Sequence, residues 1–191
     1  MRKKISDMTL EELWELFPIF LVEHKNSWKD YYLEMEERIR SELAEIQIVR
    51  VSHIGSTAIN NIRAKDIVDI LLEVAHTERL ENAAKRIEEM GFVKMSFSEG
   101  RYSFNIGYTE EGFADKVYHL HLRYDGDNDE LYFRDYMNEH PQYAKEYECL
   151  KMDLQKKYEH DRDGYTNAKT EFVKKYTAEA KKKYTDRFIG K

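Results

Sequence analysis

The sequence predicts an α+β protein in which a small mixed β-sheet is flanked by helices and followed by a C-terminal helical cluster. The chain has 191 residues with only 2 prolines and 8 glycines, which favours helices and few tight hairpins. Near both ends of the chain, apolar residues recur every three or four positions. Between residues 47 and 124 the pattern changes to the alternation of β-strands. We expect a single domain over residues 1–191, with N-terminal helices at 1–46, the sheet core at 47–124 and C-terminal helices at 127–185.

Two helices are expected before the sheet. Thr9 and Glu12 have the spacing of a capping box, which predicts a short helix that ends near Leu16. Ser27 is expected to cap a second helix. The buried stripe of this second helix is predicted to contain Trp28, Tyr32, Met35, Ile39, Leu43 and Ile46.

The sheet core is predicted to contain five strands and one helical crossover. The strands are expected at 47–54, 66–74, 92–97, 101–108 and 116–124. The second strand is nearly continuous in apolar residues, so it is expected to be central and covered on both faces. Thr77 is expected to cap the crossover helix and Gly91 to end it.

The rest of the chain is predicted to be helical. One helix is expected over 129–139, and Pro141 breaks it and starts the next, since proline suits a first helical turn. The last helix is expected to run from Asp161 to Tyr184.

Composition excludes several classes of protein. With 41% hydrophobic and 36% charged residues, the chain is neither a disordered tail nor a fibre. The net charge of −6 argues against a nucleic acid polymer as partner, because such binding needs a basic face. A single cysteine fits a reducing cytoplasmic location. No apolar run approaches the ~20 residues of a membrane span, so no membrane partner is expected. The oligomeric state is left open.

Strand alternation indicates a polar face on the sheet. Arg101, Ser103 and Asn105 share one face of their strand. In the next strand, His119 and His121 share a face with Arg123. Solvated sheet faces favour Lys, Glu and Thr, so this composition predicts a polar cleft, with a plain solvated face as the alternative. The opposite face of the first of these strands is predicted to carry Tyr102, Phe104, Ile106 and Tyr108.

Asp69 lies inside an otherwise apolar strand, where a carboxylate is costly unless it is paired or bound to a cation. Two interpretations stay open. The carboxylate is hydrogen-bonded to the backbone or to a lysine, or it is a metal ligand that faces the histidines. Asp66 has the opposite parity and is expected to point away.

Gly55, Ser56 and Thr57 follow the first strand and precede a short helical turn. Glycine lets the backbone approach a ligand, and hydroxyl groups with free amides suit a phosphate. A plain turn is the alternative.

Several segments together resemble the GrpB family. The stretch HIGSTAINNIRAKDIVDI at 53–70 resembles the family signature, which usually reads close to HIGSTAVPGLxAKPIIDI. The resemblance continues in ELFPIFLVEH, in HLHLR, in ELYFRDYMNEHPQYAKEY and in RDGYTNAKTEFV, in order along nearly the whole chain. This chain departs from the signature at Asn60 and Asn61, where Pro-Gly is usual, and at Asp66, where proline is usual.

The GrpB family is in turn similar to the nucleotidyltransferase superfamily, whose mixed sheet carries a Gly-Ser turn and two aspartates one residue apart. The resemblance therefore implies a nucleotidyltransferase-like fold, with Gly55 and Ser56 as the turn and Asp69 as the first aspartate. The position of the second aspartate is Leu71, which cannot bind a cation. At most one tightly held divalent ion is expected.

The leading hypothesis is transfer of a nucleotidyl group from a nucleoside triphosphate to a small-molecule acceptor, with Mg²⁺ or another divalent cation. Asp69, His119 and His121 are the candidate catalytic residues, and Asp69 and His121 the candidate metal ligands. The candidate phosphate-binding residues are Gly55, Ser56, Thr57, Lys65, Arg101, Arg123 and Lys169. One alternative is a non-catalytic module that binds a nucleotide or phosphorylated metabolite, which Leu71 favours. Another is a hydrolase in which both histidines hold a transition metal.

Overall fold

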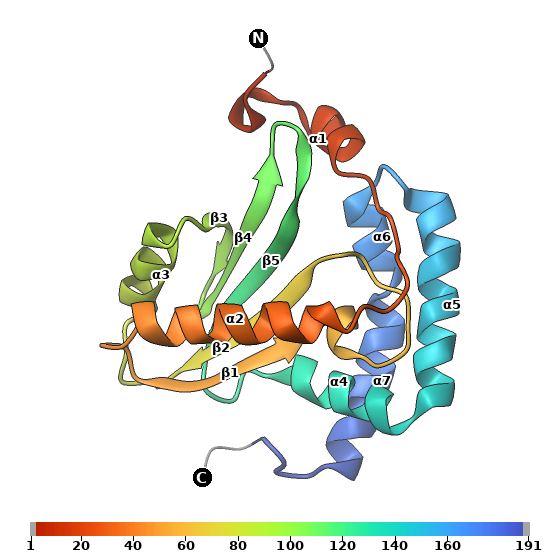
Figure 1. Cartoon of the computed structure of the whole chain (residues 1–191). Coiled ribbons are helices and arrows are strands. Elements are labelled where there is room, and N and C mark those ends of the chain that lie inside the picture. Colours follow the sequence, from red (N-terminus) through yellow and green to blue (C-terminus); the bar gives the residue numbers. More distant parts are fainter. Residues whose placement is uncertain (1–2, 189–191) are drawn as a thin grey trace.

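The computed structural model describes residues 3–188 and contains one five-stranded sheet with helices packed on it (Figure 1). The strands are β1 (Ile48–Ile54), β2 (Val68–Val74), β3 (Val93–Ser98), β4 (Arg101–Thr109) and β5 (Gly112–Tyr124). The α-helices are α1 (Leu10–Leu16), α2 (Ser27–Glu42), α3 (Leu80–Glu89), α4 (Asp129–Glu139), α5 (Pro141–Tyr158), α6 (Arg162–Ala168) and α7 (Thr170–Lys183). Two 3₁₀ turns are η1 (Ile5–Asp7) and η2 (Ser56–Ala58).

The sheet is mixed, as predicted. Its strand order is β1-β2-β5-β4-β3, in which β2 and β5 are parallel and the other neighbours are antiparallel. β2 lies between β1 and β5, and all but one of its residues are buried. This confirms the prediction of a central strand covered on both faces.

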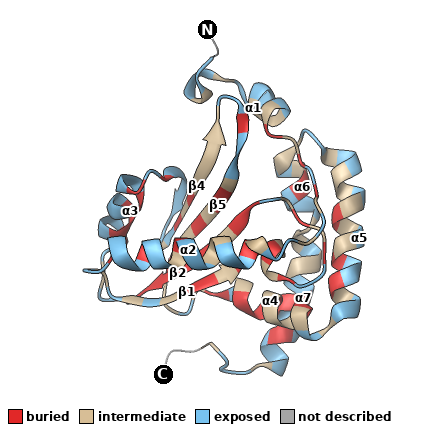
Figure 2. Ribbon diagram, viewed as in Figure 1, coloured by how far each residue is buried: buried red, intermediate tan, exposed pale blue. Residues whose placement is uncertain are grey.

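Helices α2 and α3 pack on one face of the sheet and form the main apolar core with it. Figure 2 shows buried positions along the strands and on the inward side of α2. The largest contributors to this core include Trp28, Ile39, Ile70, Ile87, Phe104 and Leu120. Asp66 lies on this side, where it accepts hydrogen bonds from Lys25 Nζ at 2.5 Å and Trp28 Nε1 at 2.6 Å. It therefore points away from the polar face, as expected.

The opposite face of the sheet is polar. Asp69 on β2 pairs in register with His119 on β5, which pairs in turn with Asn105 on β4. Two residues further along, His121 pairs with Leu71 on one side and Ser103 on the other. Because directly paired residues share a face, the predicted polar face is confirmed for these residues. The C-terminal helices α5, α6 and α7 stand together beside one end of the sheet (Figure 1).

The prediction for Tyr108 was wrong because of a β-bulge. The pairing of β4 with β5 shifts between Ile106 and Tyr108, at Gly107, whose φ is +95°. Residues 114–117 of β5 lie opposite Gly107 alone, and the positive φ of Gly107 reverses the alternation along β4. Ile106 packs against the core, whereas the Tyr108 hydroxyl lies 2.9 Å from His119 Nε2 on the polar face.

Three helix boundaries also differ from the prediction. The N-cap of α2 is Asn26, with Ser27 as the first helical residue, and α3 is capped at Arg79 rather than at Thr77. The expected final helix is two helices, α6 and α7, divided at Lys169. Its apolar spacing continues across this break, so the spacing does not reveal it.

Within residues 3–188, no helix combines the length and apolar character that a membrane span needs.

Candidate functional site: a lysine-lined cavity

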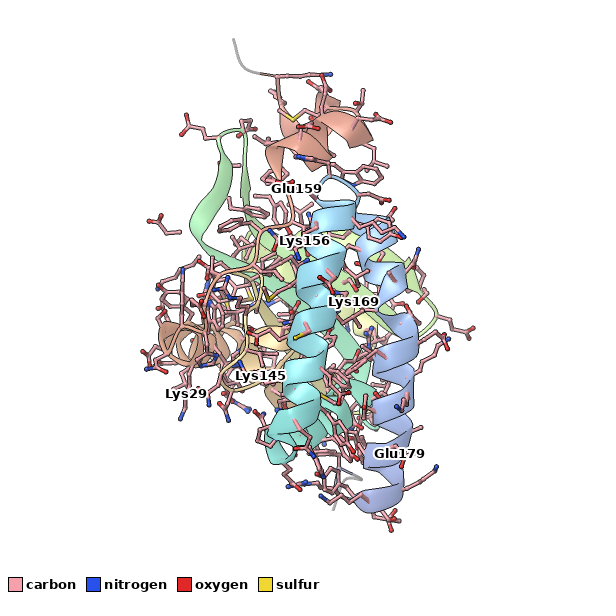
Figure 3. The ribbon with its side chains drawn as sticks, turned by 90° about the vertical axis from the view of Figure 1, so that its right-hand side faces the viewer. Lys29, Lys145, Lys156, Glu159, Lys169 and Glu179 are labelled. Atoms are coloured by element: carbon pink, nitrogen blue, oxygen red, sulfur yellow. The ribbon has the colours of Figure 1, made fainter. Side chains whose placement is uncertain are left out.

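A cavity of about 610 Å³ lies where the polar face of the sheet meets the C-terminal helices. Its inner wall is formed by the turn at 55–57, by Asp69 and by His119. Its outer wall comes from α4, α5, α6 and α7. In Figure 3, α6 and α7 follow one another beside α5, and Lys169 is labelled between them. The predicted site residues that line it are Gly55, Ser56, Thr57, Lys65, Asp69, His119 and Lys169.

Five lysines line this cavity, and two of them, Lys174 and Lys181, are exposed. The other three come from distant parts of the chain: Lys65 before β2, Lys151 on α5 and Lys169 between α6 and α7. Lys151 is only 1% exposed and donates a hydrogen bond to the backbone carbonyl of Arg63. Lys169 Nζ lies 4.2 Å and Lys65 Nζ 5.8 Å from the centre of the Tyr165 ring. The faces of aromatic rings attract cations, so this ring helps to hold both ammonium groups in place.

Burial makes the charged state of these lysines costly. It lowers the pKa of Lys65 and of Lys151 to about 7, and that of Lys169 to about 8. The positive charges of Arg162 and Lys169 lower the pKa of Lys65 further, and that of Lys169 lowers the pKa of Lys151. The negative charge of Asp69 partly opposes the fall in the pKa of Lys65 and of Lys169, and that of Glu148 opposes the fall for Lys151. In the described part of the chain, none of the three forms an ion pair with a carboxylate. A bound anion would supply the charge that this cluster lacks.

Asp69 is the carboxylate at the inner wall. Its Oδ1 atom lies 3.1 Å from His119 Nδ1 and 3.8 Å from His121 Nε2. Burial alone would raise the pKa of Asp69, but the hydrogen bonds and the charge interactions with the two histidines hold it well below its usual range. Burial lowers the pKa of His119, which favours the neutral imidazole. His121 does not reach the cavity wall, and its Nδ1 lies 3.4 Å from the Ser103 hydroxyl.

A hydrogen-bonded chain orients His119. Arg162 Nη2 donates to the Tyr108 hydroxyl at 2.8 Å, and that hydroxyl lies 2.9 Å from His119 Nε2. Every group in the chain is satisfied when Tyr108 donates to His119 Nε2 and His119 Nδ1–H donates to Asp69. Both ring nitrogens of His119 are therefore engaged.

The turn after β1 packs directly against Asp69. Gly55 has a φ of +71°, and a Cβ atom there would lie 2.2 Å from Asp69 Oδ2. Any residue with a Cβ atom is therefore disfavoured at this position, both by the positive φ and by the clash with Asp69. The hydroxyl of Thr57 lies 2.9 Å from His53 Nε2, so it already has a protein partner. Ser56 faces Tyr147: burial raises the pKa of Tyr147 to about 12, and a hydrogen bond with Ser56 opposes that rise.

Two predicted phosphate-binding residues lie elsewhere. Arg101 forms two hydrogen bonds to the carboxylate of Asp127, at 2.7 and 2.6 Å, and Arg123 lies 3.2 Å from Glu130. Both belong to the correct sheet face, but they lie far along it. Four residues separate His119 from Arg123, which is about 13 Å in a strand. Parity therefore predicted the face correctly but not the position along the strand.

The residues present do not fit a resident Mg²⁺ ion. Within residues 3–188, no group of three or more His, Cys, Asp or Glu side chains is arranged to hold a metal. Mg²⁺ prefers six oxygen ligands, whereas the groups that contact the Asp69 carboxylate are the imidazoles of His119 and His121. The other carboxylates that line the cavity, Asp129 and Glu130, pair with Lys181 and Arg123. Leu71 is fully buried in an apolar cluster with Ile54 and Leu131. The surroundings of the second-aspartate position are therefore as apolar as the residue itself.

Sequence reasoning missed the site roles of Tyr108 and Tyr165 and did not single out Lys151 among the cations of the C-terminal helices. The bulge at Gly107 has no pattern of its own beyond the glycine. Lys151 had a usable signal, because it follows Tyr147 by four residues on a helix and so shares its buried face.

Comparisons with known proteins agree on one family. The family model described as "GrpB protein" matches residues 18–179. The "Glutamate-rich protein GrpB" of Alkalihalophilus pseudofirmus is 35% identical over 161 residues, which is 81% of this chain and 91% of that protein. The "UPF0157 protein YqkA" of Bacillus subtilis is 28% identical over 94% of this chain, which spans 53% of that longer relative. The crystal structure of the conserved protein GrpB from Enterococcus faecalis superposes with a TM-score of 0.74 at 28% identity, covering 86% of this chain and 99% of that one.

Proposed function

Because the chain belongs to the GrpB family, we propose that its lysine-lined cavity binds the phosphate groups of a nucleotide or another phosphorylated small molecule. The observation that carries this proposal is the set of three lysines, Lys65, Lys151 and Lys169, which share a cavity and have no carboxylate ion pair in the described chain. Protonated lysines in such sheltered positions are costly without a counter-charge, and a bound phosphate group would supply that charge.

Phosphate suits this arrangement better than other common anions. Lysine acts as a compact point charge toward phosphate oxygens. Three such charges from separate elements surround an anion with several oxygens, and Ser56 adds a hydroxyl beside them. The volume of about 610 Å³ is typical of a small-molecule site. The cationic character is local, since the whole chain carries a net charge of −6.

Nucleotidyl transfer to a small-molecule acceptor is the second candidate, and Asp69 favours it. This carboxylate lies at the edge of the cavity with a pKa well below its usual range, and the family resemblance equates it with the first aspartate of nucleotidyltransferases. In such a reaction an acceptor hydroxyl attacks the α-phosphorus and pyrophosphate leaves. The lysines would stabilise the charge that develops on the phosphate oxygens. Any divalent cation would enter with the triphosphate as part of the substrate. Release of pyrophosphate from ATP and Mg²⁺ by the full chain, lost in Asp69→Asn, would support transfer over binding alone.

The binding proposal is tested by calorimetric titration of the full chain with ATP and with tripolyphosphate. Lys169→Met should weaken both by tenfold or more, since a charge-assisted hydrogen bond contributes roughly 1.5–3 kcal/mol. Lys156→Met is the matched control, because Lys156 on α5 is 75% exposed and lies outside the cavity (Figure 3). Equal affinities for the native chain and Lys169→Met, or no binding of either compound, would contradict the proposal.

A further inference from the structure

A second hollow, of about 680 Å³, lies between the N-terminal segment and the β3–β4 edge of the sheet. One wall is formed by α1, with Leu10 and Trp14, and the other by β3, with Val93 and Met95. Tyr108 also lines it, together with Arg162. We call this hollow the N-terminal groove.

Both walls of the N-terminal groove present apolar side chains to solvent. Leu10 is 51% exposed, Val93 63% and Met95 59%. Helix α1 has seven residues, four of them apolar, and none of the seven is buried. A helix of this length is only marginally stable by itself. It therefore depends on packing, which the rest of the chain supplies only in part. Apolar walls on both sides of a hollow indicate a ligand with an apolar body.

One half-buried charge lies within this groove. Arg162 packs over the Tyr108 ring, with its Cζ atom 5.4 Å from the ring centre, and donates to the Tyr108 hydroxyl. Within residues 3–188, Arg162 has no carboxylate ion-pair partner. The other charged lining residues, Lys4, Glu110 and Asp163, are exposed. The groove thus combines apolar walls with one sheltered guanidinium that has unused donors.

We propose that the N-terminal groove is a second ligand site, for an apolar small molecule that carries a carboxylate. The apolar body lies between α1 and β3, and the carboxylate accepts hydrogen bonds from Arg162. Guanidinium and carboxylate groups match in a planar two-bond geometry, which a lysine would not provide. The Tyr108 hydroxyl also contacts His119, so the N-terminal groove and the lysine-lined cavity lie at the two ends of one hydrogen-bonded chain.

The probe for this site is sodium decanoate, titrated below its micelle concentration into the full chain by calorimetry. The uncharged comparator is 1-decanol, which has the same apolar body. We expect decanoate to bind at least tenfold more tightly than decanol. In Arg162→Gln this preference should disappear while decanol binding is retained, because the apolar walls are unchanged.

A second variant guards against a folding defect in Arg162→Gln. Met95→Glu places a charge on an exposed wall residue and should weaken both ligands, with Leu33→Glu as the matched control on α2, where Leu33 is 49% exposed and outside the groove. Failure of decanoate to bind at millimolar concentration, or an unchanged preference in Arg162→Gln, would overturn the proposal. The proposal would also be overturned if the native chain formed a dimer and Met95→Glu abolished that dimer, since a second copy would then cover the groove. ATP binding to the lysine-lined cavity is read separately, so either site can fail without the other.

Discussion

Gly55 and Asp69 lie so close together that adding a single Cβ atom at Gly55 should destabilise the protein. In Gly55→Ala, the new atom would lie 2.2 Å from Asp69 Oδ2, and the backbone would keep a φ of +71°. We expect a loss of more than the ~1–3 kcal/mol that such backbone strain costs alone, because Asp69 must also move. Urea unfolding measures this loss, and titration with ATP measures the effect on the site.

Gly126→Ala is the matched control for this substitution. Gly126 has a φ of +89°, but a Cβ atom there meets nothing within 4 Å. It should therefore show the backbone strain without the displacement of Asp69. If the two variants lose the same stability, the contact with Asp69 does not matter.

The lysine pKa values predict how phosphate binding depends on pH. Burial lowers the pKa of Lys65 and Lys151 to about 7 and that of Lys169 to about 8, so these groups lose their protons between pH 7 and 9. The affinity for ATP should fall as the pH rises from 7.5 to 9.5, a range in which phosphate groups, with a pKa of about 6, keep a constant charge. Binding at pH 8.5 should take up protons, which titrations in buffers of different ionisation enthalpy detect. An affinity for ATP that does not change with pH, together with no proton uptake on binding, would contradict this prediction.

The lowered pKa values of the same lysines also make the free energy of unfolding depend on pH in a predictable direction. Their folded pKa values lie below the unfolded value of about 10.4, so the unfolded chain binds more protons between about pH 7 and 10. Their contribution to the free energy of unfolding is therefore fully present above that range and is lost as the pH falls toward 7. Bound ATP should remove much of this loss, because it stabilises the protonated lysines.

At the scale of elements, the sequence predicted most of what positions the site and missed two local irregularities. The polar face, the central position of β2 and the helix start at Pro141 all follow from periodicity and proline chemistry. The bulge at Gly107 and the break at Lys169 do not, because one residue with an unusual backbone conformation leaves the surrounding apolar pattern intact. Those two irregularities direct Tyr108 toward His119 and place Lys169 at the cavity wall.

The packing of Leu71 predicts that restoring the second aspartate will not restore a two-ion site. Leu71→Asp puts a carboxylate into an apolar cluster that includes Ile54, Leu131 and Phe188. We expect a loss of at least the ~2–5 kcal/mol typical of removing a buried leucine side chain. Leu71→Asn, of similar size but uncharged, separates the cost of the charge from that of the lost packing. Mg²⁺ titration by calorimetry should show no pair of saturable sites in Leu71→Asp, and finding such a pair would contradict the prediction.

At the scale of the whole molecule, the three lysines connect parts of the chain that no strand pairing joins. Lys65 precedes β2, whereas Lys151 and Lys169 belong to the C-terminal helices. Lys65 and Lys169 were expected to bind phosphate, but sequence separation of this size explains why their meeting with Lys151 in one cavity was not predicted. The core between α2, α3 and the sheet holds none of the three lysines.

This separation predicts where a bound phosphate ligand will stabilise the protein. A ligand that contacts Lys65 together with Lys151 and Lys169 ties the approach to β2 to α5 and to the α6–α7 junction. A ligand that binds only the folded state adds about 2.7 kcal/mol at a hundred times its dissociation constant. Amide hydrogen exchange with saturating ATP should therefore slow at residues 55–69 and throughout α5–α7. Helix α3, on the opposite face of the sheet, should exchange unchanged except through global unfolding. In Lys169→Met the added protection should disappear from α6 and α7 at the same ATP concentration. If ATP slowed exchange equally across the chain, α3 included, the ligand would stabilise the protein only against global unfolding. That result would contradict a phosphate that bridges the sheet and the C-terminal helices.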